Sequence, residues 1–356
     1  MRILVLGGGG REHALAWKLA QHSQLDKMFA APGNAGIASL AECVPLDPAD
    51  PKAVAKFAED QGIELTVVGP EAPLVAGVAD ELIARELPVF GPTSAGARIE
   101  SSKSWAKDLM ARAGVPTAAS ESFARVEDAM SFVDSLTPPY VVKADGLAAG
   151  KGVLICESRA DAEAALRLCL EDRAFGEAGS TVVVEEFLEG VELSLFCLTD
   201  GASVLPLVEA RDFKRAYDGD AGPNTGGMGA YSPVPDAAGV VRSLRSLVFE
   251  PTVEALSAEG IRYVGVLYAG LMLTADGPKV LEFNARFGDP ETQVVIPRLD
   301  GDLADLLVAC AEGRLDGVSA AWTSKACVTV VLASQNYPES SPVGFDISGL
   351  DIASRM

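Results

Sequence analysis

The segment 281–293, LEFNARFGDPETQ, carries side chains whose types and spacing suit phosphate chemistry. Glu282 and Asn284 stand two residues apart in a strand-like run, so both side chains leave the same face of a sheet. A carboxylate and an amide oxygen are hard ligands of the kind that hold Mg²⁺ against nucleotide phosphates. Arg286 takes the next position on that face if the strand extends so far.

The residues that follow, Gly288 to Glu291, are typical of a turn into a helix, with proline and acidic residues in its first turn. A metal pair, a cation and a helix N-terminus in one short segment favour a site that handles phosphate. An ordinary strand with a polar outer face is also compatible with these residues. The segment alone leaves both interpretations open.

Four consecutive glycines, residues 7–10, lie between a predicted strand at 2–6 and a predicted helix at 11–21. Glycines in this position let the backbone approach an anion, and the helix N-terminus offers free N–H groups. This arrangement predicts a binding loop for phosphate, with a plain tight turn as the alternative.

The loop does not complete the dinucleotide fingerprint, which needs a third glycine and then an acidic residue after the second strand. Glu12 or His13 occupies the third position, and the second strand ends in Pro32-Gly33-Asn34 without an acid. A nicotinamide dehydrogenase therefore fits poorly. A phosphate-bearing ligand held by the loop and Arg11 fits better.

Two lysines flank a glycine-rich stretch in residues 140–153. Lys143 ends an apolar strand, where a lysine is uncommon unless it is paired. The spacing is not that of a P-loop, because Gly152 stands where Ser or Thr should follow Lys151. The segment predicts a lysine on nucleotide phosphates beneath a flap, with a snorkelling lysine at a strand end as the alternative.

Two further segments could bind ligand through their main chain. Residues 183–192 form a strand, a bend and a new strand, which could meet a purine edge and offer an acid to ribose hydroxyls. Residues 211–215 precede a glycine-rich stretch at 222–233, a main-chain donor surface suited to phosphate. A disordered linker is the alternative there, but the large side chains of Met228 and Tyr231 argue against it, because they can be buried against the rest of the protein.

Composition narrows the class of protein. A chain of 356 residues predicts two to three domains, and 49% hydrophobic with 22% charged residues is globular. The formal charge of −21 argues against non-specific nucleic-acid binding. Six scattered cysteines and two histidines make a zinc cluster implausible. We see no signal peptide and no apolar run long enough to span a membrane, so the expected location is the cytoplasm.

The pattern of elements predicts an α/β protein. Strands alternate with helices at the N-terminus, which indicates a doubly wound parallel sheet, and strands become denser afterwards. We place domain boundaries to give an N-terminal sheet domain at 1–100, a connecting helical segment at 101–122, a small α+β domain at 123–191, a core at 192–324 and the start of a further domain at 325–356.

Several individual elements can be assigned. We expect helices at 75–85 and 240–259, a long loop at 219–235, and a hairpin that joins 263–273 to 279–284.

Together these motifs resemble the ATP-grasp ligases, and more closely the phosphoribosylamine–glycine ligase family of purine biosynthesis. The resemblance covers essentially the whole chain. Its motifs, in order, are GGGGREH at 7–13, PGN at 32–34, GPEAPL at 69–74, KADGLAAGKG at 143–152, GPNTGGMGAY at 222–231 and the segment 281–293. It implies a Rossmann-like N-terminal domain, a small lid and an ATP-binding core.

The resemblance also implies a reaction. Glycine is joined to 5-phosphoribosylamine while ATP becomes ADP and phosphate, through glycyl phosphate. Catalysis in such ligases consists mostly of positioning and charge neutralisation.

Residue roles follow from the same resemblance. ATP is assigned to Lys103, Lys143, Lys151, Gly152, Glu185, Glu186, Phe187, Leu188 and Glu192. The metal, Mg²⁺ or Mn²⁺, is assigned to Glu282 and Asn284. Catalytic roles fall to Arg286 at the transferring phosphoryl group, Asp212 at the glycine ammonium, and Asp289. The substrates are assigned to Gly9, Gly10, Arg11, Glu12, Gly33, Asn34, Glu71, Asn224, Gly226, Gly227 and Met228.

The chain departs from the family pattern in three places. Phe213 stands where many relatives have His, so a polar role there is lost or is met by Asp212 and Lys214. The first hairpin strand, 263–273, contains no acid for a second metal ion. The family also usually continues into a complete C-terminal domain, which we expect to be truncated here.

These departures keep two other functions open: another ATP-grasp carboxylate–amine ligase, or a non-catalytic nucleotide-binding fragment. The expected partners are glycine, 5-phosphoribosylamine and ATP, with no nucleic acid and no membrane. We expect a monomer or a weak dimer.

Overall fold

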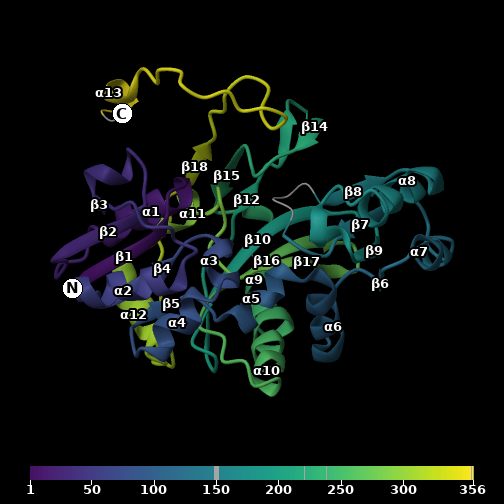
Figure 1. Ribbon diagram of the computed structural model, residues 1–356. Coiled ribbons are helices and arrows are strands. Elements are labelled where there is room, and N and C mark those ends of the chain that lie inside the picture. Colours follow the sequence, from purple (N-terminus) through teal and green to yellow (C-terminus); the bar gives the residue numbers. More distant parts are fainter. Residues whose placement is uncertain (148–151, 220, 238, 354, 356) are drawn as a thin grey trace.

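A computed structural model describes residues 1–147, 152–219, 221–237, 239–353 and 355. Its N-terminal part is a five-stranded parallel sheet in the order β3-β2-β1-β4-β5, with helices between the strands (Figure 1). This confirms the predicted parallel sheet. Its elements are β1 (Arg2–Gly7), α1 (Gly10–Leu19), β2 (Lys27–Pro32), β3 (Glu42–Cys43), α2 (Pro51–Gln61), β4 (Leu65–Val68), α3 (Glu71–Val75), α4 (Val78–Ala84) and β5 (Val89–Phe90).

The helix predicted at 75–85 is present as α4, but it begins three residues later than expected and follows a separate short helix. α3 ends at Val75 and α4 begins at Val78. Gly77 between them has a φ of 85°, a left-handed conformation that interrupts the helix and that glycine adopts without steric cost. Glu71, the first residue of α3, follows the carboxyl end of β4 by three residues. That edge of a parallel sheet is where such folds bind ligands.

A smaller antiparallel sheet, in the order β6-β9-β7-β8, forms a lobe at one end of the molecule (right in Figure 1). We call this lobe the lid. Its two helices and its strands share an apolar core of their own. The boundary drawn before residue 123 falls inside β6. The elements are β6 (Ser120–Phe123), α7 (Val126–Val133), β7 (Tyr140–Ala144), β8 (Val153–Cys156), α8 (Arg159–Leu170) and β9 (Val182–Glu186).

The central sheet is antiparallel, in the order β11-β10-β16-β17, and it contains the predicted hairpin. One apolar cluster joins this sheet to the N-terminal sheet, so Leu4 and Leu6 of β1 share a core with Leu195 and Leu267. The elements are α5 (Ser94–Ser101), α6 (Lys103–Ala113), β10 (Val191–Thr199), β11 (Val204–Pro206), α9 (Val241–Leu244), α10 (Glu250–Ala258), β16 (Gly265–Thr274) and β17 (Gly277–Asn284).

The helix predicted at 240–259 is not regular. A π-helical turn at Arg245–Phe249 separates α9 from α10, with an extra residue in the turn. Val248 and Phe249 of this turn are fully buried. The apolar packing of this segment was predictable from sequence, whereas the wider turn was not.

The long loop predicted at 219–235 is wrong in part, since it contains strands. β14 (Ala221–Asn224) pairs with β13 (Arg215–Tyr217), and β15 (Gly229–Ser232) pairs with both β12 (Arg211–Asp212) and β18 (Cys327–Val330). Glycine-rich strands lack the apolar alternation that marks a strand in sequence. β15 is instead flanked by β12 and by β18, which lies about a hundred residues away along the chain, and β14 is paired with β13.

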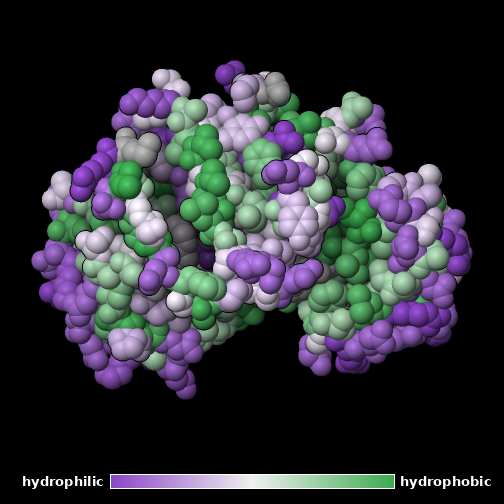
Figure 2. Space-filling view, turned by 90° about the horizontal axis from the view of Figure 1, so that it is seen from above, coloured by the Kyte–Doolittle hydropathy of each residue, from purple (hydrophilic) through white to green (hydrophobic). Residues whose placement is uncertain are grey.

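Among the described residues, the last part of the chain contains three α-helices, one strand and an exposed stretch. α11 (Thr292–Val295) and α12 (Leu303–Ala311) precede β18, and α13 (Leu350–Ala353) lies near the end. Contrary to the prediction, Pro290 and Glu291 precede α11 and are not in its first turn. Apolar side chains from β18 onwards are exposed, such as Leu332 and Phe345. Figure 2 shows the face seen from above, where apolar patches lie between hydrophilic outer ends. None of the described helices is long and apolar enough to cross a membrane.

Candidate active site

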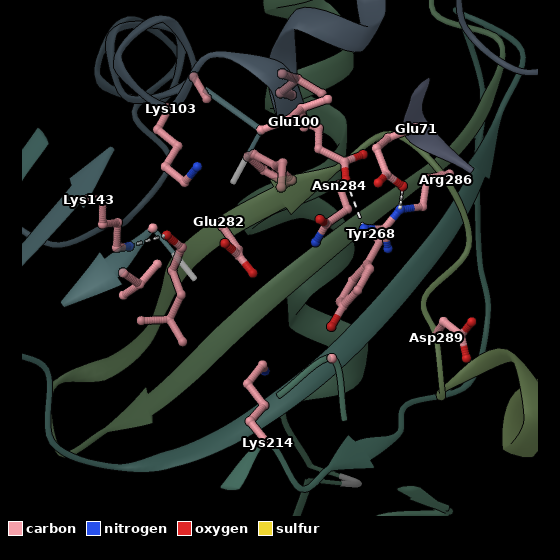
Figure 3. Close-up of a pocket in the computed structure, with 18 of the residues that line it drawn as sticks. Glu71, Glu100, Lys103, Lys143, Lys214, Tyr268, Glu282, Asn284, Arg286 and Asp289 are labelled. Atoms are coloured by element: carbon pink, nitrogen blue, oxygen red, sulfur yellow. Dashed lines mark hydrogen bonds and ion pairs between the residues drawn. The ribbon is translucent and has the colours of Figure 1, made fainter. Parts of the chain in front are cut away.

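A cavity of about 380 Å³ lies where the N-terminal domain, the lid and the central sheet meet. Figure 3 shows Lys103 and Lys143 on one side of the cavity and Arg286 with Glu71 on the other. Twelve of the side chains or glycines assigned from sequence line it: Arg11, Glu71, Lys103, Lys143, Gly152, Glu185, Asp212, Gly226, Glu282, Asn284, Arg286 and Asp289.

Glu282 and Asn284 both face the cavity from β17, while Phe283 between them is buried in the core. The pairing of β17 with β16 shifts register between Gly270 and Leu271. Because of this irregularity, Val280 and Phe283 both pack into the core although they are three residues apart. Neither Glu282 nor Asn284 makes a side-chain hydrogen bond or ion pair with any residue that the structure describes. Their oxygens are therefore free for a cation, and an unpaired carboxylate–amide set fits Mg²⁺.

The charge of Glu282 is favoured by its neighbours. Burial acts to raise its pKa, but the ammonium groups of Lys143, Lys214 and Lys103 more than offset this and lower the pKa below the ordinary value. The carboxylate is therefore ionised at neutral pH.

Arg286 reaches the cavity by a different route from the one expected. β17 ends at Asn284, so Arg286 is not the next residue on the strand face. Ion pairs place its guanidinium instead: Nη2 lies 2.8 Å from Glu100 Oε1, and Nε lies 3.4 Å from Glu71 Oε2. Glu100 of α5 is a site residue that sequence reasoning missed. It lies in a helical segment with no motif to mark it.

Three lysines supply positive charge on the lid side. Lys143 Nζ donates to Leu281 O at 3.1 Å and lies 3.0 Å from Glu185 Oε2. Lys103 Nζ donates to Gly146 O at 3.0 Å, and burial lowers its pKa. Lys107, one turn further along α6, was missed although the spacing of four residues after Lys103 puts it on the same helix face. Burial lowers the pKa of Lys107 to about 8.

Of the other residues assigned to ATP, some line the cavity and others do not. Glu185 lines the cavity and is paired with lysines, whereas Glu186 does not line it. Glu186 Oε1 accepts from the Ala119 amide at 3.0 Å and lies 3.0 Å from Lys279 Nζ. Phe187, Leu188 and Glu192 also lie outside the lining, and Glu192 pairs with Lys214 at 3.2 Å. Lys151 lies outside the described residues.

An acidic corner lies at the end of the cavity near β12. Asp212 Oδ2 is 3.1 Å from Lys214 Nζ. Glu291 is buried, and its Oε1 accepts hydrogen bonds from Tyr268 at 2.7 Å and from Ser194 at 3.2 Å. Burial, together with the charge of Asp212, raises the pKa of Glu291. Tyr268 and Glu291 were missed as site residues, although Glu291 stands within the segment that first indicated a site.

The first glycine loop, residues 7–10, is stabilised by the side chain of Glu12. Its Oε2 accepts from the Gly9 amide at 2.7 Å, and its Oε1 pairs with Arg11 Nε at 2.5 Å. Glu12 is thus used within the loop and does not line the cavity, whereas Arg11 does. Arg11 Nη1 donates to Phe287 O at 3.1 Å, which ties the loop to the residue after Arg286.

Close packing explains the glycines of this loop. A Cβ on Gly10 would lie 2.7 Å from Gln293 Nε2, and a Cβ on Gly8 would lie 2.5 Å from the carbonyl oxygen of Gly33. Asn34 Nδ2 donates to the Gly8 carbonyl at 2.9 Å. Gly9, Gly10, Gly33 and Asn34, which were assigned to the substrates, do not line the cavity.

The second glycine loop, residues 222–229, reaches the cavity through Thr225 and Gly226, while Asn224, Gly227 and Met228 do not line it. Gly227 has a φ of 124°, and a Cβ there would lie 2.3 Å from Pro290 Cδ. Phe213 is half-exposed, packs its ring against Tyr231 and does not line the cavity. Its neighbours Asp212 and Lys214 do.

Comparisons with known proteins identify the family of this chain. The family description "Phosphoribosylglycinamide synthetase, N domain" matches residues 1–100, and "Phosphoribosylglycinamide synthetase, ATP-grasp (A) domain" matches residues 101–292. A phosphoribosylamine–glycine ligase from Agrobacterium fabrum is 52% identical over 340 residues, covering 95% of this chain and 80% of the relative.

Solved structures show the same fold. The phosphoribosylamine–glycine ligase of Thermotoga maritima superposes with a TM-score of 0.79 at 33% identity, over 96% of this chain and 83% of that one. The biotin carboxylase domain of Hydrogenobacter thermophilus 2-oxoglutarate carboxylase, solved with MgADP, gives a TM-score of 0.69 at 18% identity over 88% and 69%. On the strength of the family match and the sequence identity, this chain belongs to the phosphoribosylamine–glycine ligase family of ATP-grasp enzymes.

Proposed function

We propose that this chain ligates glycine to 5-phosphoribosylamine at the expense of ATP, giving N1-(5-phosphoribosyl)glycinamide, ADP and phosphate in purine biosynthesis. Family membership supports the reaction. The observation that carries the proposal for the site is the placement of Glu282 and Asn284, unpaired, between three lysines and Arg286 in one cavity. That arrangement matches the charges of a triphosphate and its cation.

The nucleotide occupies the lid side of the cavity. Lys103 and Lys143 neutralise its phosphates, and Glu282 with Asn284 would hold Mg²⁺ or Mn²⁺, which would supply positive charge to the phosphates. The unpaired oxygens of Glu282 and Asn284 support this role, because they are the cavity's only described carboxylate–amide pair on adjacent same-face positions. With no acid on β16, the pair is the principal anchor of the cation.

Glycine and the acceptor occupy the opposite side. Asp212 receives the glycine ammonium, and Arg11, Glu71 and the first glycine loop receive 5-phosphoribosylamine. The glycine carboxylate attacks the γ-phosphorus and ADP leaves, which gives glycyl phosphate. The amine nitrogen then attacks the acyl carbon and displaces phosphate. Arg286 neutralises the transferring group, so the protein contributes positioning and fixed charges.

The reaction is tested by phosphate release with ATP, Mg²⁺, glycine and freshly made phosphoribosylamine. We expect release to require both glycine and the amine. Release that does not depend on glycine would refute the proposal, and ATP binding without turnover would favour a nucleotide-binding protein instead. Replacing Mg²⁺ by Mn²⁺ in the same assay tests the cation. A monomer or weak dimer remains our prediction for the oligomeric state.

A further inference from the structure

Arg286 connects the acceptor side of the cavity to the nucleotide side through two unequal contacts. Glu100 is buried, lies 2.8 Å from Nη2 and also accepts a hydrogen bond from the Ala285 amide at 2.7 Å. Glu71 lies 3.4 Å from Nε and keeps 36% of its side chain exposed. Glu100 is therefore a fixed partner of the guanidinium, and Glu71 is an exchangeable one.

The Nε–H of Arg286 is the unsatisfied edge of the guanidinium. Nε is buried, and among the described residues it donates no hydrogen bond, although the Glu71 carboxylate lies beside it. A buried donor without an aligned acceptor is unfavourable. An acceptor that forms a well-aligned hydrogen bond with this Nε–H can therefore replace the contact with Glu71.

Glu71 belongs to the domain that receives the acceptor. It opens α3 after β4, and its carboxylate is influenced by Arg11 as well as by Arg286. Arg11, from α1, donates to the carbonyl of Phe287, the residue next to Arg286. Figure 3 shows the Glu71 carboxylate directed at the Arg286 guanidinium, with Asn284 on the nucleotide side. A molecule bound at Arg11 and Glu71 therefore affects two contacts: that of Arg11 with the Phe287 carbonyl, and that of Glu71 with Arg286 Nε.

Resting on the function proposed above, we propose that Glu71 is a positioning residue that occupies Arg286 Nε until the acceptor binds. The hydroxyls and amine of 5-phosphoribosylamine are donors that a carboxylate accepts. Once they engage Glu71, the Nε–H turns to an oxygen of the γ-phosphoryl group. Acceptor binding thereby promotes the first half-reaction. A bond forms between the glycine carboxylate oxygen and the γ-phosphorus, the bond to the β,γ-bridging oxygen breaks, and ADP leaves with that oxygen.

Such coupling has a chemical purpose. Glycyl phosphate formed without acceptor could react only with water, which would waste ATP. An Arg286 that is held by Glu71 in the absence of acceptor suppresses this loss.

Positional isotope exchange in ATP carrying ¹⁸O at the β,γ bridge follows the first half-reaction alone. The enzyme is incubated with Mg²⁺ and glycine, with or without ribose 5-phosphate, which has the hydroxyls and phosphate of the acceptor but no amine. When ADP is formed, the labelled bridge oxygen becomes one of the oxygens of its β-phosphate, which can rotate. If the half-reaction then reverses and ATP is re-formed, the label is found in non-bridging positions as well. We expect ribose 5-phosphate to accelerate scrambling about tenfold, the range of typical coupling between sites. In Glu71→Gln, scrambling without ribose 5-phosphate should already approach the accelerated rate.

Glu59→Gln is the matched control, since Glu59 is an exposed carboxylate of the same domain that pairs with Arg85. It should scramble label as the unmodified protein does. Equal scrambling with and without ribose 5-phosphate, at concentrations where it competes with phosphoribosylamine in the full reaction, would overturn the coupling. So would a Glu71→Gln variant that still needs the analogue.

The two proposals fail in different ways. Absence of glycine-dependent phosphate release in the complete reaction counts against the ligase function. If phosphate release in the complete reaction is normal but scrambling in Glu71→Gln still depends on ribose 5-phosphate as in the unmodified protein, the coupling alone is refuted. Circular dichroism checks that Glu71→Gln is folded, and if it is not, the comparison in the unmodified protein still decides the question.

Discussion

Lys107 Nζ lies 3.2 Å from Oε1 of Glu185, the carboxylate oxygen that Lys143 does not contact. All three side chains are buried. Two lysines thus share one carboxylate, and the group carries a net positive charge whenever both lysines are protonated. Lys107 also donates to Thr117 Oγ1 at 2.7 Å, which fixes its ammonium group at a second point.

We predict that Lys107→Met weakens ATP binding without unfolding the protein. Its loss leaves Glu185 to Lys143 alone, so the positive charge available to the phosphates falls. We expect KM for ATP to rise about tenfold, equivalent to about 1.4 kcal/mol, with a smaller change in kcat. Initial rates at varied ATP measure this. Lys107→Arg keeps the charge and serves as the control, and an unchanged KM in Lys107→Met would remove Lys107 from the nucleotide site.

The lowered pKa of Lys107 also predicts a pH dependence of stability. Burial lowers this pKa from 10.5 to about 8 in the folded protein, so between these pH values the unfolded chain binds more protons. The free energy of unfolding contributed by Lys107 therefore increases as pH rises through this window, by about 1–3 kcal/mol.

Urea denaturation at pH 7.5 and pH 9.5 measures this contribution. The increase should be present in the unmodified protein and reduced in Lys107→Met, because methionine does not titrate. An equal pH response in the two proteins would contradict the buried, pKa-shifted lysine.

The motifs that were predictable from sequence are those whose neighbours in space are also neighbours along the chain. Glu282 and Asn284 needed only the period of a strand, and the glycines at 7–10 needed only a strand followed by a helix. Lys107 shares a helix face with Lys103 through the four-residue period, but it was not assigned, because its partner Glu185 lies on a strand far along the chain.

The residues that were missed depend on contacts between distant segments. Glu100 became a site residue because α5 lies against the end of β17, where the Ala285 amide binds it. Glu291 is defined by Tyr268 and Ser194 on two other strands. Likewise β15 is a strand only because β12 and β18 flank it. Periodicity reports local structure and carries no information about such partners.

Glu282→Ala should abolish ligation while leaving the fold intact. The Glu282 carboxylate makes no hydrogen bond or ion pair among the described residues, so its removal costs little stability. Loss of the principal metal ligand should reduce kcat by about 10³-fold or more. Phosphate release and thermal unfolding measure the two effects. Asp276→Ala, at the exposed turn of the same hairpin, is the control and should retain activity. Full turnover in Glu282→Ala would exclude Glu282 from the site.

Gly227→Ala tests how the second glycine loop supports the acidic corner. Gly227 has a φ of 124°, and a Cβ would lie 2.3 Å from Cδ of Pro290, which is followed by Glu291. The ring cannot yield without moving the backbone, so the substitution combines backbone strain with a clash. We expect a loss of about 2–4 kcal/mol in the free energy of unfolding, together with a higher KM for glycine.

Gly62→Ala separates these two effects. Gly62 also has a positive φ, of 60°, but nothing lies within 4 Å of a Cβ placed there. It ends α2, far along the chain from the acidic corner, so only the backbone strain applies. We expect a loss of about 1 kcal/mol and an unchanged KM for glycine. Equal losses in the two variants, measured by urea denaturation, would show that contact with Pro290 does not matter. An unchanged KM for glycine in a destabilised Gly227→Ala would instead separate the loop from the glycine subsite.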